Sequence, residues 1–289
     1  MWSPSSRPGP AGWFYAVRWG EKSFVALYLS LISGVVVALQ YDAAAPSYSA
    51  NTIELLIPFG GFWRSLHFYA SQLFFLCFLC HFAVIVTAGI PAMPYRKWLL
   101  LVASLPVTVL LLFTGYVLRA DATGEAAGAI AENIMLSVPV AGEWLNALLF
   151  SIARDGMVRV YANHVVGLGL LWLVLCWDHV RRYRVGFRQH GGFAVALLLF
   201  CLLIEAPLES YRPGIFYIAG PWFFLGLQEL LRVFPPFWAG VFLPLLFLAA
   251  LLLVPLGAVW RRRALGFVVL WLVVYGVLTV VGALRGVAF

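Results

Sequence analysis

Long stretches of apolar residues recur along this chain, and each is close to the length of a membrane-crossing helix. They fall at roughly 23–41, 66–90, 97–118, 162–180, 191–208, 236–259 and 264–284. A helix needs about 20 apolar residues to cross the hydrocarbon core of a bilayer, whereas a membrane strand alternates apolar and polar positions. The stretches here are continuous rather than alternating. The pattern therefore predicts an all-α fold, a polytopic transmembrane helical bundle of about seven spans.

Two of the segments between these spans, 119–161 and 209–235, are longer than ordinary connections. The second is rich in aromatic residues and contains Pro221, which suits the first turn of a short helix at the membrane interface. We therefore expect both segments to fold into surface helices or a functional cap.

Composition and charge fit a membrane protein and set its expected orientation. Hydrophobic residues make up 63% of the chain and charged residues 11%. Twelve of the 19 basic residues fall in the N-terminal segment and in alternate connections, whereas most carboxylates fall in the other connections. The positive-inside rule then predicts a cytoplasmic N-terminus and, with seven spans, a C-terminus on the outer side. The net charge of +7 indicates attraction to anionic membrane lipid rather than to nucleic acid.

Four of the five histidines lie in predicted spans, where they form two pairs. His67 and His81 are 14 residues apart, and His164 and His179 are 15 apart. A helix advances about 1.5 Å and 100° per residue, so each pair spans roughly 21 Å and stays close to one helix face. Ionisable side chains inside a membrane are costly and usually functional. Two such helices facing each other would offer two bis-histidine sites, one toward each membrane surface.

Paired histidines of this kind favour haem over other metal centres. Neutral imidazole binds iron, and a haem takes one axial ligand on each face. Copper or zinc is less favoured because no third or fourth ligand accompanies either pair, and a packing role or a proton relay in a transporter is the remaining alternative. The chain contains no CxxCH motif, so a covalent c-type haem is not expected.

Several neighbouring residues fit two macrocycles between these helices. Arg64 and Arg159 precede the first histidine of each pair and would bind the propionates of the outer haem, unless they only reach toward the interface. Gly20, Gly34 and Gly115 would let a flat ligand approach the backbone, although membrane helices also use glycine for packing.

Three stretches are specific in combination: RSLHFYASQLFFLCFLCH (64–81), GYVL (115–118) with the loop that follows it through Pro139, and VRVYANHVVGLGLLWLVLCWDH (158–179). Through them the chain resembles the cytochrome b subunit of the respiratory bc and photosynthetic bf complexes over nearly its whole length. Residues 1–189 resemble its four-span di-haem part, and 190–289 resemble the three-span subunit that follows, fused here into one chain.

The resemblance implies two b-type haems and names their axial ligands. It implies that His67 and His164 ligate an outer, low-potential haem and that His81 and His179 ligate an inner, high-potential haem. The bf type tethers a further haem through a cysteine near the first helix. No cysteine precedes Cys77 here, so that tethered haem is not expected.

The outer quinol site departs from the family pattern. The family carries Pro-Glu-Trp-Tyr in the loop before the sixth span, and the matching stretch here is Gly220-Pro221-Trp222-Phe223, without the glutamate or the tyrosine. The family's Pro-Trp-Gly after GYVL is replaced by 119–121, Arg-Ala-Asp. Pro221, Trp222 and Phe223 would still line an outer quinol pocket. Glu209 or Glu229 would supply the missing carboxylate for proton transfer.

An inner quinone pocket is a further hypothesis. Arg182, Arg188 and His190 would line it and deliver protons from the cytoplasm, unless they only form a basic loop of the positive-inside kind.

The function predicted from these observations is electron transfer across a bilayer. The chain would be a di-haem cytochrome b in an energy-transducing membrane, expected to be a bacterial cytoplasmic membrane, and a subunit of a quinol:acceptor oxidoreductase rather than a complete enzyme. Its partners would be quinone or quinol, iron–sulfur or c-type cytochrome subunits on the outer face, and a second copy within a dimer. The alternative is a di-haem anchor of a non-bifurcating complex that links the quinone pool to a periplasmic dehydrogenase or multihaem cytochrome.

Overall fold

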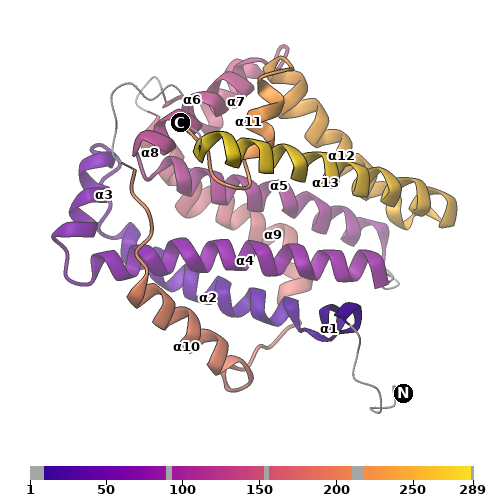
Figure 1. Cartoon of the computed structure of the whole chain (residues 1–289), viewed down its shortest axis with the longest axis horizontal. Helices are drawn as coiled ribbons and strands as arrows, with labels where there is room; N and C mark the ends of the chain where they lie inside the picture. The colour runs from indigo at the N-terminus through magenta and orange to yellow at the C-terminus, as the bar shows by residue number, and fades with distance from the viewer. Residues whose placement is uncertain (1–9, 89–92, 153–155, 210–217, 288–289) are drawn as a thin grey trace. The chain divides into compact units, whose positions relative to one another are not determined.

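Helices form all the regular structure that the computed structural model describes, which covers residues 10–88, 93–152, 156–209 and 218–287 (Figure 1). Six of the described helices are long and apolar enough to cross a membrane. They are Trp19–Ala38, Gly60–Ala88, Tyr95–Val117, Met157–Val180, Trp238–Leu256 and Ala258–Gly286. The predicted polytopic all-α bundle is therefore confirmed.

The remaining predicted span, 191–208, forms a helix that is shorter than expected. This helix, α10, covers Phe187–Leu203 and is 17 residues long. It would reach about 26 Å, slightly less than the roughly 30 Å of a hydrocarbon core. The chain leaves the helix at Ile204 in an extended conformation, so the last residues of the predicted span lie outside it. Whether the chain ends lie on opposite membrane sides therefore stays a prediction.

The chain divides into two compact units that interleave along the sequence, 1–37, 61–92 and 183–206 in the first and the remainder in the second. The predicted functional boundary at 189/190 is a different division and stays a prediction. The helices of the first unit are α1 (Pro10–Ala16), α2 (Trp19–Ala38), α4 (Gly60–Ala88) and α10.

In the first unit, α10 is fixed to α4 by apolar and polar contacts. Leu66 and Ala70 of α4 pack in one buried cluster with Leu197 and Cys201 of α10. The backbone N–H of Ala206 donates to the Ser65 hydroxyl at 2.8 Å, so the chain beyond α10 is held as well.

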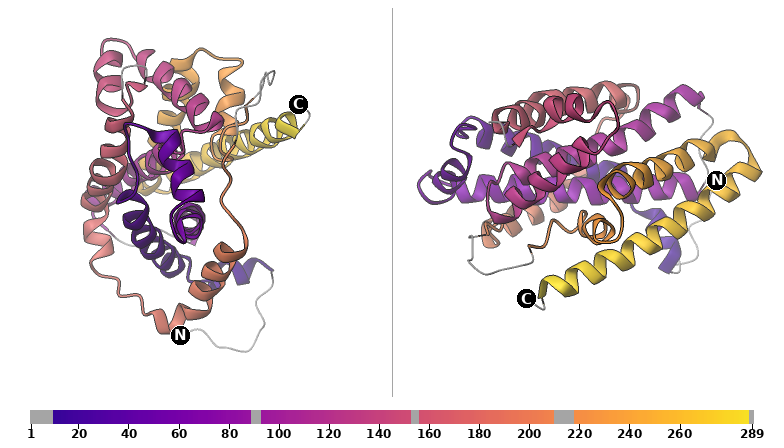
Figure 2. Two further views of the ribbon diagram at one scale, coloured as in Figure 1. Left: turned by 90° about the vertical axis from the view of Figure 1, so that its left-hand side faces the viewer. Right: turned by 90° about the horizontal axis from the view of Figure 1, so that it is seen from above.

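The second unit contains most of the short helices. Its elements are α3 (Pro46–Leu55), α5 (Tyr95–Val117), α6 (Ala122–Leu136), α7 (Gly142–Leu149), α8 (Met157–Ala162), η2 (Asn163–Gly167), α9 (Leu168–Val180), α11 (Leu225–Leu231), η3 (Trp238–Phe242), α12 (Leu243–Leu253), η4 (Val254–Leu256) and α13 (Ala258–Val287). The run α8–η2–α9 forms one continuous helix, called the composite helix below. Helices α12 and α13 pack against each other and are joined by the tight turn η4 (Figures 1 and 2).

The two long connections fold largely as expected. Helices α6 and α7 occupy most of the first connection, and the composite helix begins at its end. Helix α11 occupies part of the second. Residues 153–155 of the first and 210–217 of the second lie outside the described residues. Asp121 begins α6 by accepting the N–H of Gly124 at 2.9 Å, as an N-cap residue does.

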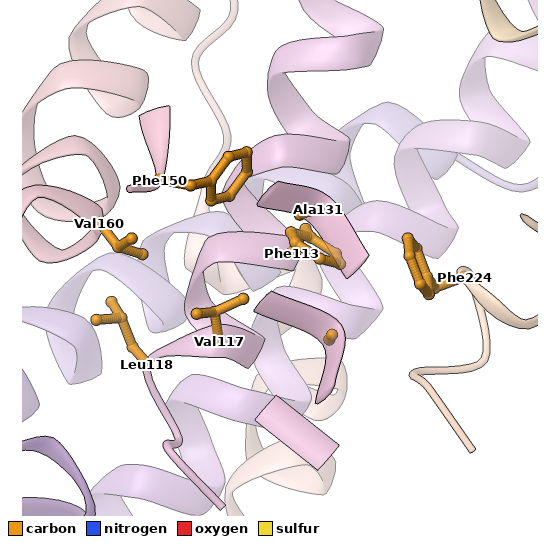
Figure 3. Packing of buried hydrophobic residues seen from close by; sticks show 8 residues of the cluster. Phe113, Val117, Leu118, Ala131, Phe150, Val160 and Phe224 are labelled. Atoms are coloured by element: carbon orange, nitrogen blue, oxygen red, sulfur yellow. The ribbon is translucent and has the colours of Figure 1, made fainter. Parts of the chain in front are cut away.

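A buried apolar cluster holds these surface helices to α5 (Figure 3). Phe113 of α5 lies 6.0 Å from Phe150 and 5.0 Å from Phe224 between ring centroids. Burial of several large side chains in one place, at roughly 1.5–3 kcal/mol each, gives α6 and the segment after 220 a fixed position within this unit.

Candidate functional site

The first histidine pair lies on one uninterrupted helix, with two glycines opposite. His67 and His81 both project from α4, which has 29 residues, and both rings are half-buried. A Cβ added at Gly34 of α2 would lie 2.7 Å from His67 Cε1, and one added at Gly20 would lie 3.1 Å from His81 Cε1. Each imidazole thus packs directly against a glycine backbone, where a larger residue would displace it.

Hydrogen bonding fixes the tautomer of His67. Its Nδ1 lies 2.8 Å from the carbonyl oxygen of Ser30. A carbonyl only accepts, so Nδ1 carries the proton and the lone pair lies on Nε2. A histidine held in this way presents Nε2 to a metal ion.

The second pair lies on the composite helix, and its first member, His164, faces a glycine. A Cβ added at Gly115 of α5 would lie 2.8 Å from His164 Cε1. The Nδ1 of His164 lies 3.0 Å from the hydroxyl oxygen of Thr114. That hydroxyl donates its only proton to the Leu110 carbonyl at 2.7 Å, so it accepts from His164 Nδ1–H. His164 therefore has the same tautomer as His67. His179 is half-buried near the end of α9.

A π-helical turn at His164 was not predicted. Residues Asn163–Gly167 form η2, in which the N–H of Leu168 donates to the carbonyl of Asn163, five residues earlier. Such turns occur mostly as single insertions within α-helices, often at functional sites. The available signal was the 15-residue interval itself, one longer than the first.

The two predicted propionate arginines have different surroundings. Arg64, one turn before His67, donates to the carbonyl of Ala206 at the end of the first unit. Arg159 is exposed in the last turn of α8, five residues before His164. Their role toward haem stays a prediction.

The segment matching the family's outer motif is held by hydrogen bonds from α11 and α13. The side chain of Gln228 accepts the N–H of Gly220 at 2.9 Å and donates to the Ile218 carbonyl at 2.8 Å. The Tyr275 hydroxyl donates to the Phe223 carbonyl at 2.7 Å. Pro221 is buried, Phe223 is half-buried, and Trp222 is 42% exposed. Gln228 and Tyr275 were not predicted, because their partners are backbone groups distant in sequence.

The two candidate carboxylates have unlike environments. Glu229 is 5% exposed, and it pairs with Arg285 at 3.2 Å and Arg232 at 3.8 Å. Glu209 is exposed; its carboxylate accepts from the Thr123 hydroxyl, and its N–H donates to Asp121 at 2.9 Å. Glu209 thus lies beside α6 next to the substituted Arg-Ala-Asp stretch, whereas Glu229 holds α11 to α13.

Among the predicted inner-pocket residues, His190 is buried in the first unit and has a carboxylate partner. Its Nε2 lies 2.7 Å from Glu21 Oε2, and Arg18 lies 3.3 Å from the same oxygen. Arg188 is exposed in the first turn of α10, and Arg182, in the second unit, is exposed just after α9. Glu21 was missed because nothing in the sequence links residue 21 to residue 190.

Comparison with known proteins identifies the family. The family model described as cytochrome b/b6/petB matches residues 6–184, which is more than half of the chain. Cytochrome b of Eptatretus burgeri is 22% identical over 92% of this chain and 80% of its own length. For cytochrome b of Albinaria caerulea the identity is also 22%, over 92% of this chain and 83% of the relative.

A solved structure, described as a hyperthermophilic respiratory Complex III, has a similar fold. It superposes with a TM-score of 0.70 at 22% identity, covering 92% of this chain and 83% of the solved one. The apolar spans, the two histidine pairs and the family match agree, and the chain belongs to the cytochrome b/b6 family of membrane proteins.

Proposed function

We propose that this membrane cytochrome b carries electrons between a quinone or quinol pocket and partner redox subunits through two b-type haems. His67 and His164 would ligate the outer haem, and His81 and His179 the inner one. The observation that carries the proposal is the fit of the histidine surroundings to haem. Three imidazoles pack against glycines, and in His67 and His164 the hydrogen bond is made by Nδ1, so Nε2 is the nitrogen that would bind iron.

Haem b, when bound, supplies one-electron transfer, and the protein supplies its surroundings. In α4, and likewise in the composite helix, two histidines about 21 Å apart along the helix would supply the imidazole nitrogens that hold the haems. The apolar helices around them exclude water and anions, which influences the potential of each centre.

Haem quantitation with redox titration of the purified complex tests the ligand assignment. We expect two b-type haems per chain and two one-electron transitions. His67→Ala should lose one transition and His81→Ala the other. Retention of both haems in either variant would show that the ligand assignment is wrong.

For the outer quinol site, we propose Glu209 as the proton acceptor in preference to Glu229. Glu209 is exposed beside α6, whereas Glu229 is buried and paired with two arginines that neutralise it. Pro221, Trp222 and Phe223 would line the pocket. Glu209→Gln should slow quinol oxidation while Glu229→Gln chiefly lowers thermal stability. Unchanged quinol oxidation in Glu209→Gln would reject this role.

At the inner side, we propose that Arg182, Arg188 and His190 serve a quinone pocket. The contact of buried His190 with half-buried Glu21 supports a proton-transfer role, because an imidazole beside a carboxylate can accept and donate a proton. Quinone reduction with a slowed proton-dependent step in His190→Gln would support it, and wild-type kinetics would reject it.

The non-bifurcating anchor is the second candidate function. It is favoured by the altered outer segment, where the family's glutamate and tyrosine are absent and Phe224 is packed into the buried cluster around Phe113. Quinol turnover that is blocked by outer-site inhibitors would favour the first candidate. Electron flow that depends only on the inner site would favour the second.

Both candidates require a multisubunit assembly. We propose iron–sulfur or c-type cytochrome subunits on the outer face, a dimeric arrangement and an energy-transducing bacterial membrane, with a cytoplasmic N-terminus. Co-purification of subunits with the tagged chain, together with accessibility of single-cysteine labels on each side, tests these proposals.

A further inference from the structure

The interval between His164 and His179 is one residue longer than that between His67 and His81, and the difference matters for ligand direction. In a regular α-helix, 14 residues leave two side chains about 40° apart, and 15 residues leave them about 60° apart on the other side. The two helices would then present their histidines with a mismatch of about 100°.

The π-turn removes this mismatch. The Leu168–Asn163 hydrogen bond closes over five residues rather than four, so η2 contains one more residue than the α-helical turn it replaces. The flanking α8 and α9 continue as if that residue were absent. The composite helix thus acquires an effective interval of 14, the same as that of α4.

Asn163 holds the turn in place. Its Nδ2 donates to the Leu148 carbonyl at 2.8 Å and lies 3.4 Å from the Leu149 carbonyl, which are among the last carbonyls of α7. Its Oδ1 would lie 3.0 Å from a Cβ at Gly167, so a glycine there gives the amide room. Asn163 therefore ties the turn that carries His164 to a surface helix.

We propose that η2 accommodates the extra residue in the interval between His164 and His179, so that the two side chains keep the relative direction of a 14-residue interval. We also propose that Asn163 is a positioning residue for the His164 ligand. The inference rests on the proposed haem ligation. It adds that the π-turn gives His164 and His179 the same relative direction as His67 and His81. We therefore expect that one residue can be removed from η2 of the composite helix without loss of haem, whereas removal of one residue between the histidines of α4 causes loss of a haem.

Two single-residue deletions test the register directly. Deleting Val166, an exposed residue of η2, should leave an ordinary α-helix with a 14-residue interval and two haems per chain. Deleting Leu76, an exposed residue of α4, should leave a 13-residue interval, rotate His81 by about 100° and reduce the content to one haem. Loss of a haem in the Val166 deletion to the same extent as in the Leu76 deletion would overturn the inference.

Substitution of Asn163 provides a readout without a deletion. In Asn163→Ala we expect one haem to be lost to an excess of haem acceptor about 10-fold faster, with a shifted potential, because partners around a metal ligand commonly change affinity 10–100-fold. Asn133→Ala is the control, since the Asn133 amide also donates to a backbone carbonyl, that of Ala129 at 2.9 Å, but within its own helix α6. Equal behaviour of the two variants would overturn the role of Asn163. A wild-type chain with fewer than two haems would instead refute the proposed function.

Discussion

Helix α4 carries its histidines on an unbroken α-helix of 29 residues, whereas the composite helix carries its pair across a π-turn. Both α4 histidines face glycines of α2, and the first is bonded to a backbone carbonyl. On the composite helix, His164 faces Gly115 and is bonded to a side-chain hydroxyl. The Nδ1 of the first histidine thus bonds to a backbone carbonyl in one unit and to a side-chain hydroxyl, beside a π-turn, in the other.

This difference indicates which substitutions should disturb the histidine surroundings on each helix. The surroundings of His67 depend on the absence of a side chain at Gly34 and on a carbonyl that no substitution removes. The surroundings of His164 depend on Thr114 and on the π-turn. Glycine replacement should therefore disturb either histidine, whereas removal of a side-chain hydrogen-bond partner should disturb only His164.

The largest expected effect is replacement of the contacting glycines by leucine. In Gly34→Leu and Gly115→Leu the new side chain would occupy the space of the His67 or His164 ring, where a Cβ alone would come within 2.7 or 2.8 Å. We expect one haem per chain instead of two, measured by pyridine haemochrome and redox titration. The control is Gly169→Leu on α9, since no atom lies within 4 Å of a Cβ there. Two wild-type transitions in Gly34→Leu would contradict the contact argument.

A smaller effect is expected from Thr114→Val, which keeps the shape and removes the hydroxyl that accepts from His164. The ring then loses the group that fixes its tautomer, and we expect roughly 10-fold faster loss of that haem. The matched substitution in the other unit is Ser30→Ala, which leaves the carbonyl bonded to His67 intact. Equal rates of haem loss in both variants would remove the distinction between the two helices.

The smallest effect is expected from Gly20→Ala. Its Cβ would lie 3.1 Å from His81 Cε1, so a shift of a few tenths of an ångström suffices, and both haems should be kept with a small change in one spectrum. Gly34→Ala, at 2.7 Å from His67, should perturb the spectrum more. Gly169→Ala should instead raise stability by about 0.5–1 kcal/mol, as is usual for a helical glycine in open space. Thermal melts and reduced-minus-oxidised spectra rank the three, and a larger change in Gly20→Ala than in Gly34→Ala would reverse the expected order.

Features that repeat along one helix could be read from the sequence. Apolar stretches predicted the positions of the spans, and the spacing of His67 and His81 placed both on one face of α4. Gly20 and Gly34 share that spacing, and the structure sets each against one histidine. In a regular α-helix, the number of residues between two positions determines the relative direction of their side chains.

Features that depend on contacts between distant segments could not be read in this way. The bond between His190 and Glu21, the hold of Gln228 on Gly220 and the early end of α10 each depend on tertiary packing. The π-turn is intermediate, because the extra residue was visible but its position was not. Asn163 identifies that position only once its partner carbonyls in α7 are known.

The hold of Gln228 on the segment before Phe223 has a consequence for how the outer motif could change during evolution. Because the side-chain amide of Gln228 bonds to the backbone of Ile218 and Gly220, these two bonds do not depend on which side chains occupy 221–223. Drift in those side chains would leave the loop intact. Pro221 occupies the position of the family's glutamate, so one substitution at Pro221, rather than a transplanted loop, is the natural step for restoring a carboxylate there.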